Sequence, residues 1–340
     1  MDISIGASNS HECPLITIGV TTYNRPELLK ECINSILSQT YQNYEIIIGN
    51  DFVERLVSFE SLSILPDDRI RIVNHPKNIG AYNNNYYLLA TASGDWFTWL
   101  ADDDLMHPKF LECAIRVAAK HDVNSVFTNY TAALSPSGIF PANISCKDPM
   151  ILSGDEFLDK FTSRQIRAIG CYGLLNRKIL PDIASAPRFG IGRPVYVDTF
   201  IPIIAASHGE LAYIDEPLVF LRTHQASGSA SDSCLETYSS AQADFLFEFE
   251  RIRKSATLPS NYEWQIEGLL HWFALDGWAV IWRKHLGIFR RLVNFVSYSY
   301  STLLPHLHGY RKVKFSLFLL RVSALDSARA LASRLLKRRR

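Results

Sequence analysis

The chain has 340 residues, of which 47% are hydrophobic and 20% are charged, and its net charge is +1 at pH 7. These values exclude a disordered or fibrous protein and indicate a globular protein of two domains, or of one domain with an appendage. Because the sequence lacks an apolar stretch of about 18 residues and residues 1–13 lack a signal-peptide pattern, we expect no membrane-spanning helix and no leader.

Predicted strands alternate with predicted helices along the first third of the chain. Short apolar runs that are typical of buried strands lie at 15–20, 44–51, 69–75, 95–100 and 123–130. Helical spacing of apolar residues follows Pro26, spans about 82–92 and returns after Pro108. Because this alternation requires crossover connections, we predict an α/β fold with a mainly parallel sheet flanked by helices.

The chain beyond residue 130 changes character twice. We therefore divide it into three regions: 1–130, the less regular 131–235, and 236–340, a helical carboxyl-terminal extension. Residues 283–340 contain 14 Lys or Arg and one acidic residue, so they carry +13 and leave −12 on the rest of the chain. Basic residues interleaved with Leu and Phe favour the surface of an anionic membrane over nucleic acid, and a helical interface between copies is the alternative.

Polar residues follow three of the predicted strands. Thr21 to Asn24 follow the first strand, Asn50 and Asp51 the second, and Asp102 to Asp104 the fourth. In open sheets, ligands bind beyond the carboxyl ends of the strands. Three adjacent carboxylates raise one another's pKa unless water or a cation compensates them, so this run is a solvated turn or a cation site. Oxygen ligands and a phosphate-bearing substrate favour Mg²⁺ or Mn²⁺ there.

Two segments carry a resemblance to a known family. PLITIGVTTYNRPELLKECINSILSQTYQNYEIIIGND (14–51) and NIGAYNNNYYLLATASGDWFTWLADDD (78–104) are similar to family 2 inverting glycosyltransferases with the GT-A fold. The resemblance covers about 14–130 closely and 165–231 more loosely. It implies a Rossmann-like GT-A domain in which 1–130 bind the nucleotide-sugar and 131–235 bind the acceptor.

The resemblance also implies an activity. The chain would be a metal-dependent enzyme that uses Mn²⁺ or Mg²⁺ and moves a sugar from a UDP-, GDP- or dTDP-linked donor. The acceptor would be a hydroxyl of a glycan or a lipid-linked glycan in bacterial surface polysaccharide biosynthesis. A non-catalytic scaffold that binds sugar nucleotides and recruits partners through its basic tail is the alternative function. A nucleotidyltransferase is disfavoured, because TTYNRPE stands where a Gly-rich phosphate loop would be needed.

Donor-binding residues are carried over by position in the family pattern. Thr21 and Tyr23 would lie against the base, Asp51 would accept a hydrogen bond from it, and Asp102 would face the ribose or the metal. The remaining candidates for donor binding are Asn24, Asn84 and Arg222, the last through phosphate oxygens.

The metal ligands follow from the same pattern and from one departure from it. Ala101 stands where many members of the family have the first Asp of a DxD motif, so the metal would be held by Asp103 and Asp104. His224 would join the metal shell or close a loop over the donor, although a lone His is more often a structural hydrogen-bonding residue. Asn50 replaces an acidic residue that is usual after the second strand.

Asp198, in RPVYVDTF, is the candidate general base for the acceptor hydroxyl. Its apolar and aromatic neighbours would raise its pKa toward a useful value, and its position matches the catalytic acidic residue of the family. The alternative is that Asp198 caps the helix predicted to begin with TFIPIIAA, since Asp is favoured at that position.

The remaining expectations concern the surroundings of the protein. Six cysteines without CxxC pairs indicate reduced thiols and hence a cytoplasmic protein. The basic residues 283–340 indicate a peripheral location on the cytoplasmic face of the membrane. The expected partners are the nucleotide-sugar, the acceptor and, in a homo-oligomer, a second copy of the chain; no nucleic acid is expected.

Overall fold

The computed structural model describes most of the first 283 residues and short pieces of the chain after them. The described ranges are 13–134, 140–141, 144–146, 148–189, 195–223, 234–255, 262–283, 294–295, 298–304, 315–316 and 318–319. No helix within these ranges is long and apolar enough to cross a membrane.

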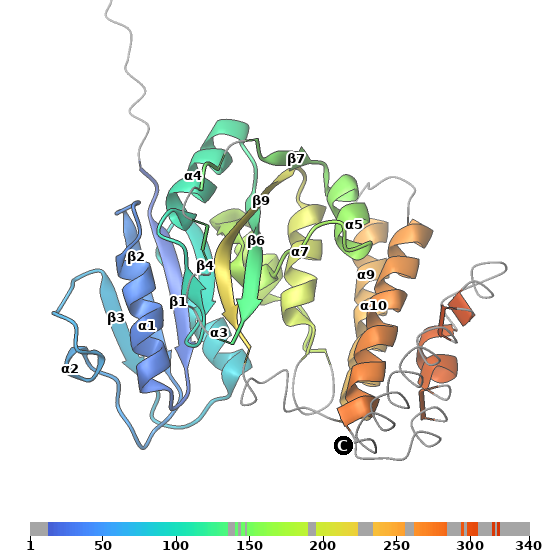
Figure 1. The fold of residues 1–340 in the computed structure, drawn as a ribbon, viewed down its shortest axis with the longest axis horizontal. Coiled ribbons are helices and arrows are strands. Elements are labelled where there is room, and N and C mark those ends of the chain that lie inside the picture. The colour runs from blue at the N-terminus through green and yellow to red at the C-terminus, as the bar shows by residue number, and fades with distance from the viewer. Residues whose placement is uncertain are drawn as a thin grey trace, which may run out of the picture.

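One nine-stranded sheet organises the described part of the chain (Figure 1). Its strands are β1 (Ile16–Thr22), β2 (Tyr44–Asn50), β3 (Ile70–Asn74), β4 (Trp96–Ala101), β5 (Leu105–Met106), β6 (Ser125–Ala133), β7 (Met150–Leu152), β8 (Leu174–Asn176) and β9 (Leu211–Arg222). They lie in the order β3-β2-β1-β4-β8-β6-β9-β5, with β7 beside β9. The predicted α/β fold is confirmed, but the sheet is mixed rather than mainly parallel.

The mixed character has a local cause. β1, β2, β3 and β4 are parallel, as crossover helices require, and β6 is parallel to β9. The short strands β5, β7 and β8 pair antiparallel with their neighbours. A strand of two or three residues can return through a loop without a crossover helix, so the helical periodicity of the sequence gave no signal for it.

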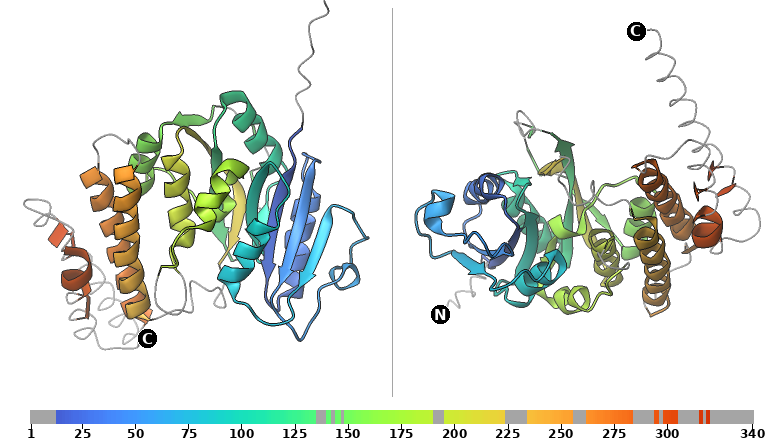
Figure 2. Two further views of the ribbon diagram at one scale, coloured as in Figure 1. Left: turned by 180° about the vertical axis from the view of Figure 1, so that it is seen from behind. Right: turned by 90° about the horizontal axis from the view of Figure 1, so that it is seen from below.

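Helices cover both faces of the sheet and form a further layer at one end (Figure 2). They are α1 (Pro26–Leu37), α2 (Phe59–Leu62), α3 (Ala81–Ala90), α4 (Phe110–His121), α5 (Gly154–Thr162), α6 (Leu180–Ala184), α7 (Val197–Ser207), α9 (Leu235–Ser255), α10 (Tyr262–Arg283), the short 3₁₀ turns η1 (Gly170–Tyr172) and η2 (Arg177–Ile179), and the π-helical turn η3 (Ser299–Leu303).

Apolar side chains of the central strands point alternately to the two faces of the sheet, and each face has its own hydrophobic core. Ile46 and Ile48 of β2 pack with α1 and α4, whereas Ile47 packs on the opposite face with α3, α5 and α7. Successive side chains of a strand point to opposite faces, so a continuous apolar run is buried on both. α9 and α10 lie side by side against α7 and α5, which confirms a helical region after residue 235 (Figure 1).

The domain boundary expected at residue 130 falls within β6, and the sheet continues across it to β9. The basic segment expected to contact a membrane, 283–340, lies mainly outside the described residues.

Cys113 of α4 and Cys146 form a disulfide, with their Cα atoms 5.6 Å apart. The expectation that all six cysteines are reduced is therefore wrong for this pair. The 33-residue separation carries no sequence signal, because only the fold brings the two thiols together. Cys13, Cys32, Cys171 and Cys234 are thiols that take no part in a disulfide.

We expect thiol counting under denaturing, non-reducing conditions to give four reactive groups, and six after reduction. Reduction should lower the free energy of unfolding by about 3.5 kcal/mol, since the cross-link restricts the unfolded chain. The double variant Cys113→Ser, Cys146→Ser should show the same loss without any reductant. A double variant as stable as the oxidised wild type would contradict the pairing.

Candidate active site at the carboxyl edge of the sheet

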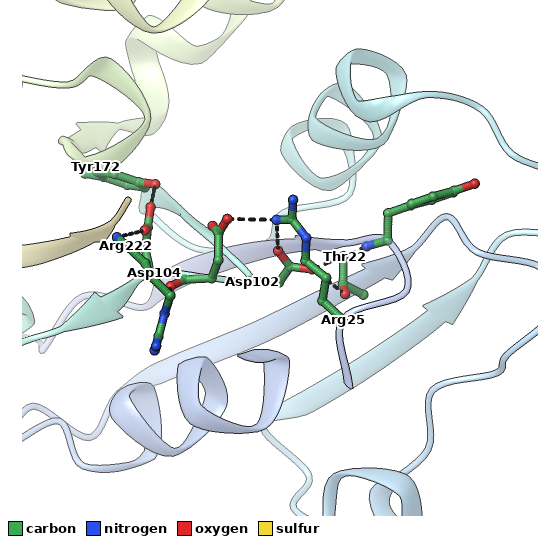
Figure 3. Close-up of polar contacts among 8 residues, drawn as sticks. Thr22, Arg25, Asp102, Asp104, Tyr172 and Arg222 are labelled. Carbon is green, nitrogen blue, oxygen red and sulfur yellow. Dashed lines mark hydrogen bonds and ion pairs between the residues drawn. The ribbon is translucent and has the colours of Figure 1, made fainter. Parts of the chain in front are cut away.

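Three aspartates lie buried where β4 ends. Asp102, Asp103 and Asp104 are only 3%, 8% and 5% exposed. A solvated turn would leave such charges in water, and buried charges need partners. The turn alternative is therefore wrong, and the run belongs to a structured polar site (Figure 3).

The site lies where the carboxyl ends of three strands meet. The pairing register sets Thr22 of β1 beside Asn50 of β2, and Thr21 beside Ala101 of β4. The three polar turns predicted from the sequence thus reach one edge of the sheet.

Asp102 joins the end of β4 to the loop after β1. Thr22 Oγ1 donates a 2.6 Å hydrogen bond to Asp102 Oδ2, and the Tyr23 backbone N–H donates one of 3.3 Å to the same oxygen. Burial raises the pKa of Asp102, while the Thr22 hydrogen bond and the charge of Arg25 oppose the rise. These contacts make Asp102 a link between two strand ends.

Arg25 is a residue of this site that the sequence reasoning missed. Its Nη1 lies 3.1 Å from Asp102 Oδ1 and 2.7 Å from Asp103 Oδ2, so one guanidinium neutralises part of two carboxylates. Arg25 immediately precedes Pro26, which starts α1, and the short loop directs it back over the aspartates (Figure 3). The sequence feature that could have identified it is a single basic residue in the polar turn after β1, since that turn was expected to meet the acidic turn after β4.

Asp104 faces the other side of the site. It accepts hydrogen bonds from the Tyr172 hydroxyl and, at 2.8 Å, from the Arg222 backbone N–H. Burial raises the pKa of Asp104 to about 7, with Asp103 and Asp102 adding to the rise. Tyr172 is a second residue that the sequence did not single out.

Arg222 ties the end of β9 to the acidic run. Its Nε donates to the Asp103 carbonyl oxygen at 3.0 Å, and its Nη2 forms a 2.5 Å ion pair with Glu31 of α1. The side chain thus lies at the site as predicted, and binding of phosphate through it would exchange Glu31 for phosphate oxygens. His224 lies outside the described residues.

Tyr23 and Asn24 are exposed on the loop after β1, while Thr21 is partly buried. The Tyr23 ring is 52% exposed and meets Phe52 edge to face, with ring centroids 5.2 Å apart. Phe52 directly follows Asp51, so an aromatic surface lies next to the residue expected to contact a base. Phe52 was not predicted.

Asp51 and Asn84 are both buried and hold the chain around the start of α3. Asp51 accepts hydrogen bonds from the backbone N–H groups of Ile79 (2.6 Å) and Gly80 (2.8 Å). Asn84 is 1% exposed, donates to the Gly49 carbonyl at 2.7 Å and lies 3.0 Å from His75 Nε2. Their expected contacts with a donor stay predictions, and the structure gives both residues a role in shaping the loop.

Asp198 occupies the first turn of α7. The helix begins at Val197 and its N-cap residue is Tyr196, so the interpretation of Asp198 as the cap is wrong. The residue is exposed to solvent, yet the protein around it removes part of its hydration and raises its pKa, and a hydrogen bond from the Cys171 thiol opposes the rise. A negative charge is also favoured in the first turn of a helix.

The turn η1 connects the two acidic parts of the site. Its first residue, Gly170, packs against the backbone of Asp198, and its last, Tyr172, donates a hydrogen bond to Asp104. Gly170 allows this approach, because a Cβ there would lie 2.5 Å from the Asp198 carbonyl oxygen. The tertiary structure therefore brings Asp198 to the acidic run, almost a hundred residues away in sequence.

The carboxylates offer the ligand type that a hard divalent cation prefers. Asp103 and Asp104 are the residues that could hold one, since both are buried carboxylates of the acidic run. Within the described ranges, no group of three or more His, Cys, Asp and Glu is assembled as a metal site. A cation at these two residues would complete its shell with water or substrate oxygens.

Comparison with known proteins identifies related sequences. The model for "Glycosyl transferase family 2" matches residues 17–183. An uncharacterized glycosyltransferase of Haemophilus influenzae is 34% identical over 120 residues, which are 35% of this chain and 37% of that protein. The glycosyltransferase GlyG of Streptococcus pneumoniae is 29% identical over 117 residues, 34% of this chain and 39% of that protein. The similarity thus spans well under two thirds of these relatives.

Solved structures give a likeness over more of the chain. Residues 1–349 of TarS from S. aureus, in complex with UDP-GlcNAc, match with a TM-score of 0.51 and 14% identity, covering 89% of this chain and 91% of that one. A second crystal structure of the same part of TarS matches with a TM-score of 0.50 and 14% identity, covering 89% of this chain and 90% of that one. At this identity the likeness shows a shared fold.

Proposed function

Because residues 17–183 match the model for glycosyl transferase family 2 and the fold is shared with TarS, we propose that the chain is a family 2 enzyme with a GT-A fold that moves a sugar from a nucleotide-sugar to an acceptor hydroxyl with inversion at the anomeric carbon. The observation that carries the proposal is the position of η1 between Asp198 and the buried acidic run: Gly170 packs against the Asp198 backbone, and the Tyr172 hydroxyl donates to Asp104. The match to a family of enzymes argues against the scaffold alternative.

The donor would lie along the carboxyl edge of the sheet. The exposed Tyr23 and Phe52 rings supply a surface against which a base can stack, and Arg25 and Arg222 supply positive charge near the acidic run. UDP-GlcNAc bound to the structurally similar TarS supports a uridine diphosphate donor as the first to test.

Transfer requires a proton acceptor opposite the leaving group. Asp198 takes the proton of the acceptor hydroxyl as that oxygen bonds to the anomeric carbon. The bond from this carbon to the diphosphate oxygen breaks, and its electron pair leaves with the diphosphate. The raised pKa of Asp198 makes the carboxylate a stronger base than an ordinary aspartate.

Asp103 and Asp104 would hold Mn²⁺ or Mg²⁺, which supplies compensation for the negative charge of the diphosphate. Without a cation, the aspartates would repel that group. Arg25 provides part of this compensation in the free protein by its contacts with Asp102 and Asp103.

The proposed acceptor is a glycan or lipid-linked glycan in the synthesis of a bacterial surface polysaccharide. We place the protein in the cytoplasm, peripheral to the membrane through residues 283–340. The basic and apolar residues of that segment support this placement, because anionic lipids attract such sequences.

The test is incubation of the purified protein with UDP-, GDP- and dTDP-sugars, with and without Mn²⁺, following sugar transfer to a glycan acceptor and slow donor hydrolysis. We expect one donor class to be consumed only with the cation and to raise the midpoint of thermal unfolding. Absence of turnover with every donor, together with absence of any thermal shift, would contradict the function.

Arg25 and the cation would compete for the Asp103 carboxylate. We expect Arg25→Met to tighten Mn²⁺ binding to the donor-free protein by at least about tenfold, since one unit charge at this separation is worth up to about 4 kcal/mol. Isothermal titration or electron paramagnetic resonance measures this affinity without any turnover.

Arg25→Lys, which keeps the charge, is the matched control and should bind Mn²⁺ within about threefold of wild type. Equal Mn²⁺ affinity in the Met variant and in wild type would show that Arg25 does not compete with the cation.

A further inference from the structure

Tyr196, two residues before Asp198, has an unusual backbone conformation. Its φ and ψ are 63° and 8°, in the left-handed region, although it is neither glycine nor asparagine. Its carbonyl oxygen accepts the first hydrogen bonds of α7, from Thr199 (3.1 Å) and Phe200 (3.0 Å). Side chains with a Cβ adopt this region at a cost and persist there only when their surroundings hold them.

The carboxyl-terminal helices hold the Tyr196 side chain. Its hydroxyl donates to Asp276 Oδ2 of α10 at 3.1 Å and accepts a 2.6 Å hydrogen bond from Gln242 Nε2 of α9. The ring lies 5.0 Å from the Phe273 ring and 6.1 Å from the Phe245 ring, centroid to centroid. Two polar and two aromatic contacts from separate helices thus fix one phenol group.

The network extends into the core. Gln242 is completely buried, and its amide oxygen accepts a hydrogen bond from the Tyr298 hydroxyl, so both ends of the amide are used. The same Tyr298 hydroxyl lies 3.0 Å from the Phe273 carbonyl oxygen, so its one proton is shared between two acceptors. Gly277 leaves room for this arrangement, because a Cβ there would collide with the Tyr298 ring. A buried polar group with every partner satisfied resists displacement.

The start of α7 is fixed on its other side by η1. A Cβ at Gly170 would lie 2.5 Å from the Asp198 carbonyl oxygen and equally close to Ile201 Cβ, so the turn and the helix are in direct contact. A shift or rotation at Tyr196 therefore changes the position of Asp198 relative to Cys171. The first turn of α7 lies between α9 and α10 on one side and the acidic run on the other.

We propose that Tyr196 is a positioning residue, through which α9 and α10 set the place of the Asp198 carboxylate beside the acceptor hydroxyl. This inference rests on the proposed function, in which Asp198 is the base. It gives the carboxyl-terminal helices a role in catalysis in addition to any contact with a membrane or acceptor.

The test is Tyr196→Phe in the full-length protein, which removes the hydroxyl and keeps the ring. We expect kcat for transfer to fall about tenfold with donor KM within twofold, because a small displacement of the base impairs proton transfer and leaves the donor contacts intact. The acid limb of the kcat profile should move to higher pH. Asp198 acts when deprotonated, and separation from the Cys171 thiol removes a hydrogen bond that lowers its pKa.

Tyr213→Phe is the matched control. The Tyr213 hydroxyl is also in the interior, where it bonds to the Arg167 backbone and has no contact with α7 or η1 in the hydrogen bonds that the structure describes. We expect this variant to lose thermal stability to a similar extent and to keep kcat and the pH profile of wild type.

Gln242→Leu provides a second route to the same effect, and the double variant with Tyr196→Phe should lower kcat no further than either single change, since both break one network. Suppose that Asp198→Asn impairs transfer as expected. If Tyr196→Phe then keeps the wild-type kcat and an unmoved acid limb, the inference about Tyr196 is overturned. If Asp198→Asn keeps full activity, the proposed base is wrong instead.

Discussion

Asp198→Asn should lower kcat for sugar transfer by about 10²–10⁴-fold and leave the donor dissociation constant within about threefold of wild type. The amide keeps the shape of the side chain but cannot accept the proton of the attacking hydroxyl. Donor binding by calorimetry and single-turnover transfer measure the two quantities separately. Because the donor contacts are assigned to β1, β2 and β4, binding should survive the change.

Asp68→Asn is the matched control, since Asp68 is an exposed aspartate just before β3, at the end of that strand opposite to the carboxyl edge where the site lies. It should retain wild-type kcat. The pH profile adds a second check: wild-type kcat should fall as pH decreases through the Asp198 pKa, which lies above that of an ordinary aspartate. Residual turnover of Asp198→Asn should lack this acid limb, and full turnover would reject Asp198 as the base.

Asp103→Ala should lower transfer by about 10²–10³-fold and weaken Mn²⁺ binding at least about tenfold. The change removes an oxygen ligand where charge develops on the departing diphosphate. The fold should persist, because Asp102 still holds Thr22, and Asp104 still holds Tyr172 and the Arg222 backbone. Equilibrium titration with Mn²⁺ and a thermal unfolding curve distinguish these effects.

Asp102→Ala is the informative comparison. Loss of Asp102 leaves the Thr22 hydroxyl and the Arg25 guanidinium without a shared acceptor, so this variant should be less stable than Asp103→Ala, by about 1–3 kcal/mol. If Asp103→Ala instead bound Mn²⁺ as tightly as wild type, the assignment of Asp103 as a metal ligand would be wrong.

The predicted strands and helices of the first 130 residues are confirmed, and the reason is local. Apolar runs such as 44–51 and helical spacing after Pro26 reflect which faces of each element are buried: both faces of β2 and one face of α1. Parallel pairing of β1, β2 and β4 then follows from the crossover helices, so the meeting of three polar strand ends was predictable too.

The short strands and the disulfide could not be predicted in this way. β5 and β8 have two and three residues, which is too few for a period to be detected. Cys113 and Cys146 meet because α4 lies near a segment that follows β6 by more than ten residues, and no local pattern encodes that distance.

The sequence by itself determined the residue types available at the edge of the sheet: an acidic run after β4, polar turns after β1 and β2, and a carboxylate in an apolar segment at Asp198. These follow from pattern and position alone. Only the tertiary structure decided which charges face one another. It placed the Arg25 guanidinium against two of the aspartates and the Tyr172 hydroxyl against the third. It also placed the Tyr196 hydroxyl in hydrogen bonds with α9 and α10. The physical reason is that ion pairs and buried hydrogen bonds depend on distances of about 3 Å between residues far apart in the chain, whereas periodicity reports only burial.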